Sequence, residues 1–462
     1  MSKFVRIIGM ELKNFKNVVL GDIQFPNHQS VKNLGEVQKS DITGIYGQNG
    51  SGKTAAVEAL DIVKSLMSGR KIDFRTYSGI VKDNTSITLN LFVQNGDEKY
   101  LVKYTAHLAL RENVISIPKE RLEIFDRGVS WKNKRAIEVD NPFYNESIVL
   151  QDVHAKVNCE GKINEYEFIN SPDKLAVSCA SRGESFFFNE SLLKSFEGKS
   201  DDGIINSLRM IFIFSKRDFF VIKVRQLGLI NGSEVLPLNV SDTIDNHIIS
   251  GCIPLFVNGN GSLPEVLFDK LPHLIDSINT ALSAIIPNLR LTYKKTGEDI
   301  YPNGMKSVNV DLFSQRGDSV FSTKYESEGI KRIISLLSCL ISAYNNENVS
   351  LVVDEFDSGI FEYMLGEILS AMEKGAKGQL IFTSHNLRAF EKLSNESIVC
   401  STAEPYNRYI RLTRINRNNN KRDFYIRALA LGGQKESLYD GDCLEDIGYA
   451  LRKAGVEYDA CQ

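Results

Sequence analysis

Cysteine and histidine are scarce in this chain, and neither residue type is clustered. The seven cysteines are scattered over 462 residues, no Cys-x-x-Cys pair occurs, and there are only six histidines. The sequence therefore predicts neither a disulfide framework nor a zinc site built from paired ligands.

Long apolar runs and an excess of one charge are also missing. No apolar stretch reaches the roughly 18 residues that a membrane span requires, and the first residues lack the pattern of a secretory signal. The 55 basic and 58 acidic residues give a net charge of −3, which argues against a globally basic nucleic-acid binder. With 42% hydrophobic and 24% charged residues, we expect a globular, cytoplasmic protein that makes no membrane contact.

The length predicts two or three domains at roughly 150 residues each. Strand and helix patterns alternate around residues 42–67 and again after residue 309, so we expect an α/β fold with a mixed, mainly parallel sheet. The expected division is a β-rich N-terminal lobe in 1–168, an inserted and largely helical lobe in 169–295, a C-terminal lobe in 296–400, and a tail in 401–462.

A glycine-rich motif occupies residues 47–54, which read Gly-Gln-Asn-Gly-Ser-Gly-Lys-Thr and match G-x-x-x-x-G-K-[ST] in full. An apolar strand pattern precedes the motif and a helical pattern follows it, as a phosphate-binding loop requires. Lys53 adds a cation at the β- and γ-phosphates, and the Thr54 hydroxyl is a ligand for Mg²⁺. We therefore predict ATP binding by the following residues: Gln48, Asn49, Gly50, Ser51, Gly52, Lys53 and Thr54.

Two later strand patterns end in polar residues that suit catalysis at a nucleotide. Residues 350–353 are followed by Asp354 and Glu355, and residues 380–383 are followed by Ser384 and His385. At the carboxyl end of a parallel strand, Asp354 is predicted to hold Mg²⁺. Glu355 is predicted to polarise the attacking water as a catalytic base, and His385 to contact the γ-phosphate or that water.

The order of these motifs resembles the ATPase heads of the ABC type, more narrowly the RecF, SMC and OLD-like group. Within that group the layout is most similar to the AAA-type ATPases of phage-defence systems, such as the PARIS-type (AriA-like) ATPases. Residues 8–17 resemble the group's opening strand, and residues 357–359 occupy the place of its D-loop. Ser327 and Gly329 look like its signature motif at the start of a helix, where N–H groups favour phosphate.

The resemblance implies a homodimer or higher homo-oligomer in which ATP is sandwiched between protomers, with Ser327 and Gly329 contacting the partner's nucleotide. It also implies a sensor or scaffold that controls an effector and responds to a phage protein. Too few residues follow His385 for a TOPRIM nuclease domain, so a nuclease or toxin effector is expected as a separate chain. No Q-loop residue is assigned, since Gln94 falls in an expected hairpin turn and Gln151 has only its position in its favour.

A basic tract between Arg408 and Arg427 leaves a nucleic-acid function open. Its cations and aromatic residues read as a β-hairpin that either binds a nucleic-acid backbone or an acidic protein, or forms a solvated face. The acidic stretch that follows is able to neutralise the tract, and Trp131 lies in a second basic loop. The alternative function is accordingly a DNA-repair or recombination ATPase of the RecF kind.

Overall fold

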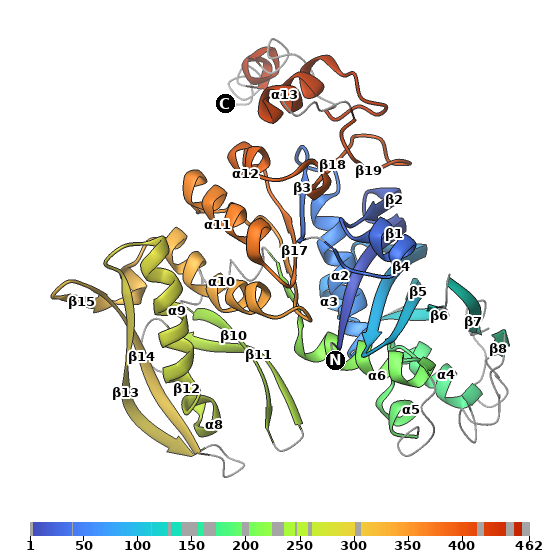
Figure 1. Cartoon of the computed structure of the whole chain (residues 1–462), viewed down its shortest axis with the longest axis horizontal. Coiled ribbons are helices and arrows are strands. Elements are labelled where there is room, and N and C mark those ends of the chain that lie inside the picture. Colours follow the sequence, from blue (N-terminus) through green and yellow to red (C-terminus); the bar gives the residue numbers. More distant parts are fainter. Residues whose placement is uncertain are drawn as a thin grey trace.

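The computed structural model describes residues 3–38, 40–111, 113–127, 131–140, 156–160, 172–195, 203–223, 235–244, 247–256, 261–300, 306–413, 420–439 and 448–454. Two large sheets lie side by side with helices between and around them, and a smaller sheet and a hairpin lie beyond (Figure 1). This arrangement confirms the predicted α/β class. No helix in the described part of the chain is long and apolar enough to cross a membrane.

The first large sheet, called here the central sheet, has six strands in the order β19-β18-β3-β17-β16-β9. Its strands are β3 (Asp41–Tyr46), β9 (Phe219–Ile222), β16 (Ser350–Val353), β17 (Gln379–Thr383), β18 (Ile398–Ser401) and β19 (Tyr409–Ile410). All neighbouring strands are parallel except β18 and β19. Every residue of the five parallel strands β3, β9, β16, β17 and β18 is buried. This burial on both faces explains why these strands lack the alternation of apolar and polar residues that a half-exposed strand shows.

Helices cover both faces of the central sheet. On one face lie α2 (Lys53–Met67) and α6 (Gly203–Arg217), and on the other lie α10 (Glu328–Asn345), α11 (Glu362–Gly375) and α12 (Leu387–Lys392). Successive residues of β16 show the alternation that a strand imposes. Val352 belongs to the core with α2, whereas Leu351 and Val353 belong to the core with α10 and α11.

The second large sheet is antiparallel and closes over α2 and α6. Its order is β2-β1-β4-β5-β6-β7-β8, formed by β1 (Lys3–Phe15), β2 (Val18–Gln24), β4 (Val81–Asn95), β5 (Glu98–Arg111), β6 (Val114–Arg127), β7 (Trp131–Asp140) and β8 (Lys156–Glu160). The β4–β5 hairpin turns at Gly96 and Asp97, as the alternation predicts. The first residues of the chain therefore build a β-rich layer over the helix that follows the phosphate loop.

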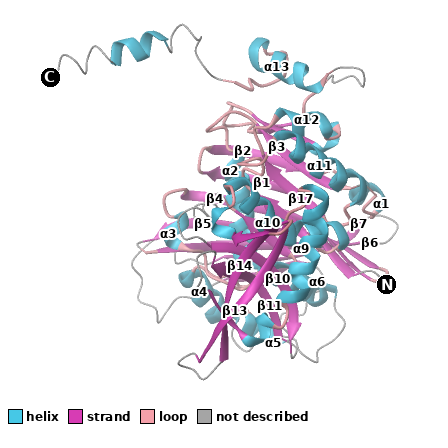
Figure 2. Cartoon of the chain, turned by 90° about the vertical axis from the view of Figure 1, so that its left-hand side faces the viewer, coloured by secondary structure: helices cyan, strands magenta, loops and turns pink. Residues whose placement is uncertain are grey.

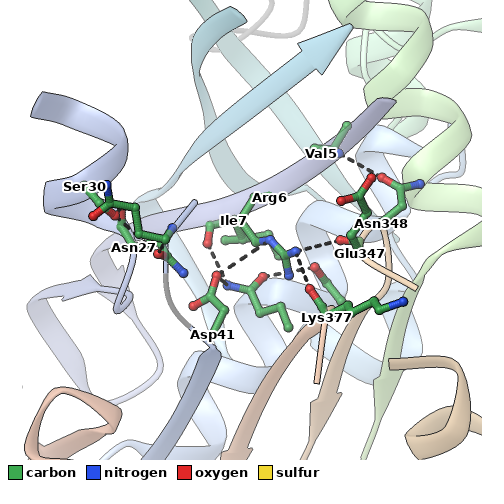
Figure 3. A network of polar contacts seen from close by, with 12 residues as sticks. Val5, Arg6, Ile7, Asn27, Ser30, Asp41, Glu347, Asn348 and Lys377 are labelled. Carbon is green, nitrogen blue, oxygen red and sulfur yellow. Dashed lines mark hydrogen bonds and ion pairs between the residues drawn. The ribbon is translucent and has the colours of Figure 1, made fainter. Parts of the chain in front are cut away.

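A buried ion pair joins the two large sheets at the amino ends of β3 and β17 (Figure 3). The phosphate loop follows the opposite, carboxyl end of β3. Arg6 of β1 lies 3.7 Å from the Asp41 carboxylate, and both side chains are 1% exposed. The guanidinium also donates to the carbonyls of Glu347 and Lys377, and Gln379 donates to Asp41. Burial lowers the pKa of Arg6 and raises that of Asp41, while their mutual attraction opposes both shifts.

The middle of the chain contains strands as well as the expected helices. The helices are α4 (Pro172–Arg182), α5 (Glu190–Ser195), α6, α8 (Glu265–Phe268) and α9 (Leu271–Ile285). The strands are β10 (Val235–Ile244) and β11 (His247–Phe256), which form a hairpin, and β12 (Gly261–Pro264), β13 (Arg290–Ile300), β14 (Lys306–Arg316) and β15 (Ser319–Ser322), which form the smaller sheet. In addition, β9 crosses back into the central sheet beside β16. Residues 169–295 therefore contribute a strand to the central sheet.

Residues 421–431 correct one sequence prediction, because they form a helix and not the return strand of a hairpin. In α13 (Lys421–Leu431) the side chain of Asn420 accepts hydrogen bonds from the amides of Arg422 and Asp423, which is a helix N-cap. Tyr425 and Ala428 are buried on one face, and the Tyr425 ring packs on Phe390 of α12. Tyr425 of the tract therefore serves helix packing, and both views place α13 beside α12 (Figures 1 and 2).

The remaining short elements are α1 (His28–Leu34), α3 (Phe74–Tyr77), η3 (Thr323–Tyr325) and η4 (Asn395–Ser397).

Candidate functional site

The glycine-rich loop connects β3 to α2, as its sequence context predicts. Gly52 is the N-cap of α2 with φ +99°, and Gly50 has φ +80°, backbone conformations that favour glycine at both positions. The loop thus delivers the free N–H groups of the helix start to one point, where the helix dipole favours an anion.

Lys53 is folded over the loop that precedes it. Its ammonium donates to the carbonyls of Gly47 (2.8 Å) and Gln48 (2.9 Å), and the side chain is 7% exposed. Burial lowers the pKa of Lys53 to about 8, although the carboxylates of Asp354, Glu355 and Asp357 raise it. A phosphate at the loop would supply the negative charge that this cation lacks.

Asp354 lies at the carboxyl end of β16, where the sequence placed it. Its Oδ1 accepts a hydrogen bond of 2.6 Å from the Thr383 hydroxyl, and Oγ1 of Thr54 lies 3.5 Å from the same oxygen. The residue is 1% exposed, and its Oδ2 is buried without a partner among the described residues. A buried, unpaired carboxylate oxygen beside a threonine hydroxyl suits a hard cation with oxygen ligands such as Mg²⁺.

Glu355 occupies the left-handed region of backbone space, with φ +47°. This conformation costs a non-glycine residue free energy and needs support from its surroundings. The Glu355 amide donates to the Thr383 hydroxyl (2.8 Å), and the Arg332 guanidinium donates to the carbonyls of Asp354 (3.1 Å) and Glu355 (3.2 Å). Residues from β17 and α10 therefore fix both carboxylate residues.

Arg332 is a site residue whose role the sequence did not reveal. It is 2% exposed, and its Nε and Nη1 are buried without a partner among the described residues. Burial lowers its pKa to about 10, against the raising effect of Asp354, Glu355 and Asp357. The available signal was a cation within the apolar pattern of residues 330–341, and such a residue needs a buried partner.

His385 follows the carboxyl end of β17 and lies near the same group of carboxylates. Its amide donates to Oδ2 of Asp357 (3.0 Å), which ties the D-loop position to the histidine. Burial and the nearby Lys53 cation lower the pKa of His385, although Asp357, Glu355 and Asp354 raise it. The imidazole is therefore neutral at pH 7, with one ring nitrogen able to accept a proton.

The expected signature residues lie at the exposed start of α10. Ser327 is the N-cap and accepts a hydrogen bond of 3.4 Å from the Ile330 amide. A Cβ on Gly329 would meet the carbonyl oxygen of Gly359 at 2.0 Å, so only glycine allows this contact. The structure thus joins the start of α10 to the expected D-loop position, while no hydrogen bond between described residues joins Ser327 to the phosphate loop of the same chain.

Two arginines of the basic tract, Arg408 and Arg411, make contacts within the chain. Arg408 is 6% exposed and donates to the carbonyls of Thr402 (2.6 Å) and Asn17 (2.7 Å). Arg411 donates to the carbonyls of Glu396, Ile398 and Gln24. These two arginines are thus engaged within the chain, whereas both alternatives left open by the sequence, a binding surface and a solvated hairpin face, place them at the surface.

Other parts of the tract and of the second basic loop are placed as follows. Residues 414–419 of the tract and residues 440–447 of the acidic stretch lie outside the described residues. The Trp131 indole donates to the Lys32 carbonyl (2.7 Å) and packs edge-on against Phe92, so it is a packing residue. Gln94 lies in β4 with its amide on the Gly96 carbonyl, and Gln151 is outside the described residues, so the Q-loop stays unassigned.

Residues 10–211 match the protein family described as an AAA domain. No curated protein matches the chain. The chain is similar to the solved structure of an SMC head bound to the C-winged helix domain of ScpA, with 12% identity, 88% of this chain and 98% of that chain covered, and a TM-score of 0.38.

A second similar structure is the SMC head domain with an extended coiled coil bound to the C-terminal domain of ScpA, from Pyrococcus furiosus (10% identity, 88% and 96% covered, TM-score 0.37). A third is the SMC head domain from Thermotoga maritima (11% identity, 88% and 100% covered, TM-score 0.34). The family match, together with the loop of residues 47–54, supports a nucleotide-binding ATPase domain in the N-terminal half of the chain.

Proposed function

We propose that the protein binds ATP with Mg²⁺ and hydrolyses it as an ATPase of the ABC type. The observation that carries the proposal is the carboxylate of Asp354. It is buried at the end of β16 with one oxygen unpaired among the described residues, and its other oxygen lies 3.5 Å from Thr54 of the phosphate loop. A loop that suits phosphate and a carboxylate that suits a divalent cation thus share one sheet edge.

The chain's own residues have distinct tasks in this reaction. The N–H groups at the start of α2 and the Lys53 ammonium bind the β- and γ-phosphates. Thr54 and Asp354 would hold Mg²⁺, which when bound neutralises phosphate charge. Glu355 orients and polarises the attacking water, and the neutral His385 hydrogen-bonds to the γ-phosphate or to that water.

We infer that the complete site needs a second copy of the chain. Ser327 is exposed at the N-terminus of an 18-residue helix, where a phosphate binds favourably. In the ABC-type arrangement it contacts the nucleotide held by the partner's loop. The contact between Gly329 and Gly359 then links that nucleotide to the D-loop and, through Asp357, to His385.

At the cellular level we propose a cytoplasmic sensor or scaffold in phage defence, in which ATP-dependent association holds an effector. The effector would be a nuclease or toxin on a separate chain, released in response to a phage protein. The support for this role is the resemblance of the motif order to defence ATPases. A RecF-like DNA-repair ATPase is the alternative, and the internal engagement of Arg408 and Arg411 weighs against it.

The Glu355→Gln variant tests the ATPase proposal. The amide keeps the shape of the side chain and removes the charge that polarises water, so ATP should bind while turnover falls by roughly 10²-fold or more. Trapped ATP should hold protomers together by linkage. Size-exclusion chromatography with ATP and Mg²⁺ should therefore show a larger species for Glu355→Gln than for Lys53→Ala. Hydrolysis at the wild-type rate would contradict the assignment of the base.

Two further measurements separate the cellular roles. Purification of the native complex with the product of a neighbouring gene should recover an effector chain if the protein is a sensor. ATPase rates with and without duplex DNA should be equal in that case. A several-fold stimulation by DNA would instead favour the repair function.

A further inference from the structure

Three residues at the β18–β19 edge of the central sheet support the phosphate loop. Ser401 ends β18, and Arg408 and Tyr409 begin the antiparallel return through β19. Their side chains are 0%, 6% and 5% exposed, and each makes contact with the loop or with a residue bonded to it. We propose that these three residues, called here the C-terminal clamp, are positioning residues that set the nucleotide affinity of the loop.

Tyr409 makes the most direct contact. Its hydroxyl donates a hydrogen bond of 2.7 Å to the carbonyl of Gly52, the N-cap of α2. Gly52 has φ +99°, and it begins the turn whose N–H groups face the phosphate. Because the carbonyl of Gly52 is fixed by Tyr409, the next peptide N–H, that of Lys53, is held in its orientation as well.

Ser401 supports the beginning of the same loop. Its hydroxyl lies 2.5 Å from the Ser51 hydroxyl and 3.0 Å from the Tyr46 carbonyl. A Cβ on Gly47 would lie 2.1 Å from Oγ of Ser401 and 2.7 Å from its carbonyl oxygen, which shows how closely Ser401 approaches the loop. The first and last glycines of the motif are therefore both in contact with the clamp.

Arg408 acts through Asn17 in the turn between β1 and β2. The guanidinium donates to the Asn17 carbonyl (2.7 Å), and the Asn17 side-chain amide donates to the carbonyl of Gly50. The methylenes of Arg408 also lie against Gly52, at 3.3 Å from where a Cβ would be. This path fixes the middle of the loop.

The segment that carries the clamp is hydrogen-bonded to β2, so the clamp residues have a fixed position from which to support the phosphate loop. The Pro405 carbonyl accepts hydrogen bonds from the amides of Val19 and Leu20, and the Arg408 amide donates to the Leu20 carbonyl. A loop whose carbonyls are fixed before the nucleotide arrives loses less entropy on binding. Removing one clamp contact should therefore weaken nucleotide binding without touching the groups that carry out hydrolysis.

The test rests on the proposed function and uses Mg-ADP as the probe, measured by isothermal titration calorimetry with the full chain. Tyr409→Phe removes only the hydroxyl and should raise the Kd for ADP about fivefold, the effect of one hydrogen bond. Asn17→Ala should raise the Kd by a similar factor, and it serves as the second variant if Tyr409→Phe does not fold. In steady-state kinetics, KM for ATP should rise while kcat changes less than twofold.

A matched control is Tyr104→Phe, which removes another buried tyrosine hydroxyl, bonded to Glu120 at 2.5 Å in the antiparallel sheet. This control should lower Tm but leave the Kd for ADP unchanged. Hydrogen exchange should become faster in residues 47–54 for Tyr409→Phe and not for the control. A Kd within twofold of wild type for both Tyr409→Phe and Asn17→Ala would overturn the clamp. If the wild-type chain itself bound no ADP, the proposed function would fail instead.

Discussion

The hydroxyl of Thr383 connects the two carboxylate residues of the site. It donates a hydrogen bond of 2.6 Å to Oδ1 of Asp354 and accepts one of 2.8 Å from the amide of Glu355. One side chain on β17 thereby orients the predicted metal ligand and supports the strained backbone of the predicted base, both in the turn that follows β16.

Replacement of Thr383 by Val should impair both functions of this hydroxyl. The Asp354 oxygen and the Glu355 amide would each lose a partner in a buried place, which should lower the free energy of unfolding by about 1–3 kcal/mol. The Mg²⁺ concentration needed for half-maximal ATPase activity should rise. Thermal unfolding and a Mg²⁺ titration measure the two effects. Thr383→Ser keeps the hydroxyl and should restore most of the Mg²⁺ response, and a Val variant with wild-type behaviour would contradict this role.

Nucleotide affinity should fall as the pH is raised through the pKa of Lys53. That pKa is about 8 in the free protein because of burial, and bound phosphate stabilises the charged form and so raises it. Above pH 8 the lysine must therefore take up a proton on binding. The Kd for Mg-ADP should be about tenfold higher at pH 9 than at pH 7.

Two variants control the pH experiment. Lys53→Arg keeps its charge at pH 9, so its affinity, whatever its level, should not change between the two pH values. Lys53→Ala should abolish nucleotide binding, because the cation at the phosphates is removed. If the wild-type Kd were equal at both pH values, the ammonium would not contact phosphate. A Kd of Lys53→Ala within about threefold of wild type would lead to the same conclusion.

Ser327→Arg should separate nucleotide binding from hydrolysis. The variant keeps its own loop and should bind ATP, but the bulky side chain at the start of α10 should block the partner's nucleotide. Mixing it with Lys53→Ala should give partial activity, since each mixed dimer has one intact composite site, and the wild-type rate should not return. Ser327→Thr keeps the N-cap and should remain active. Full hydrolysis by an ATP-bound monomer would rule out the sandwich.

Gly329→Ala should uncouple the signature helix from the D-loop. The new methyl group would meet the Gly359 carbonyl at 2.0 Å, so one of the two segments must shift, at a cost of about 1–3 kcal/mol in stability. We expect ADP binding to persist and ATPase activity to fall. Gly366→Ala in α11 is the matched control, because its Cβ would meet the side chains of Arg388 and Lys392 at 3.4 and 3.5 Å and a backbone oxygen only at 3.9 Å. It should stabilise the helix by about 0.5–1 kcal/mol.

Sequence patterns were sufficient wherever the structural cause is local. The strand at β3, the glycine loop and the helix α2 follow each other without a gap, so their periodicity and glycine spacing predict the phosphate-binding turn. The alternation in residues 87–104 predicts the β4–β5 hairpin for the same reason. The tail was misread because Asn420 is both a turn residue and a helix N-cap, and its neighbours do not decide between the two.

The tertiary structure decided which distant side chains complete the site. Nothing local to Thr383, Arg332 or Tyr409 shows that their partners are Asp354, Glu355 and Gly52. Parallel strands that are far apart in the chain end at one edge of the central sheet, and only this topology brings those groups within hydrogen-bonding distance. The sequence by itself therefore determined which motif is predicted to bind phosphate and which residues carry the carboxylates. The packing of β16, β17, β19 and α10 determined how these groups are oriented, because a hydrogen bond depends on the position of both partners.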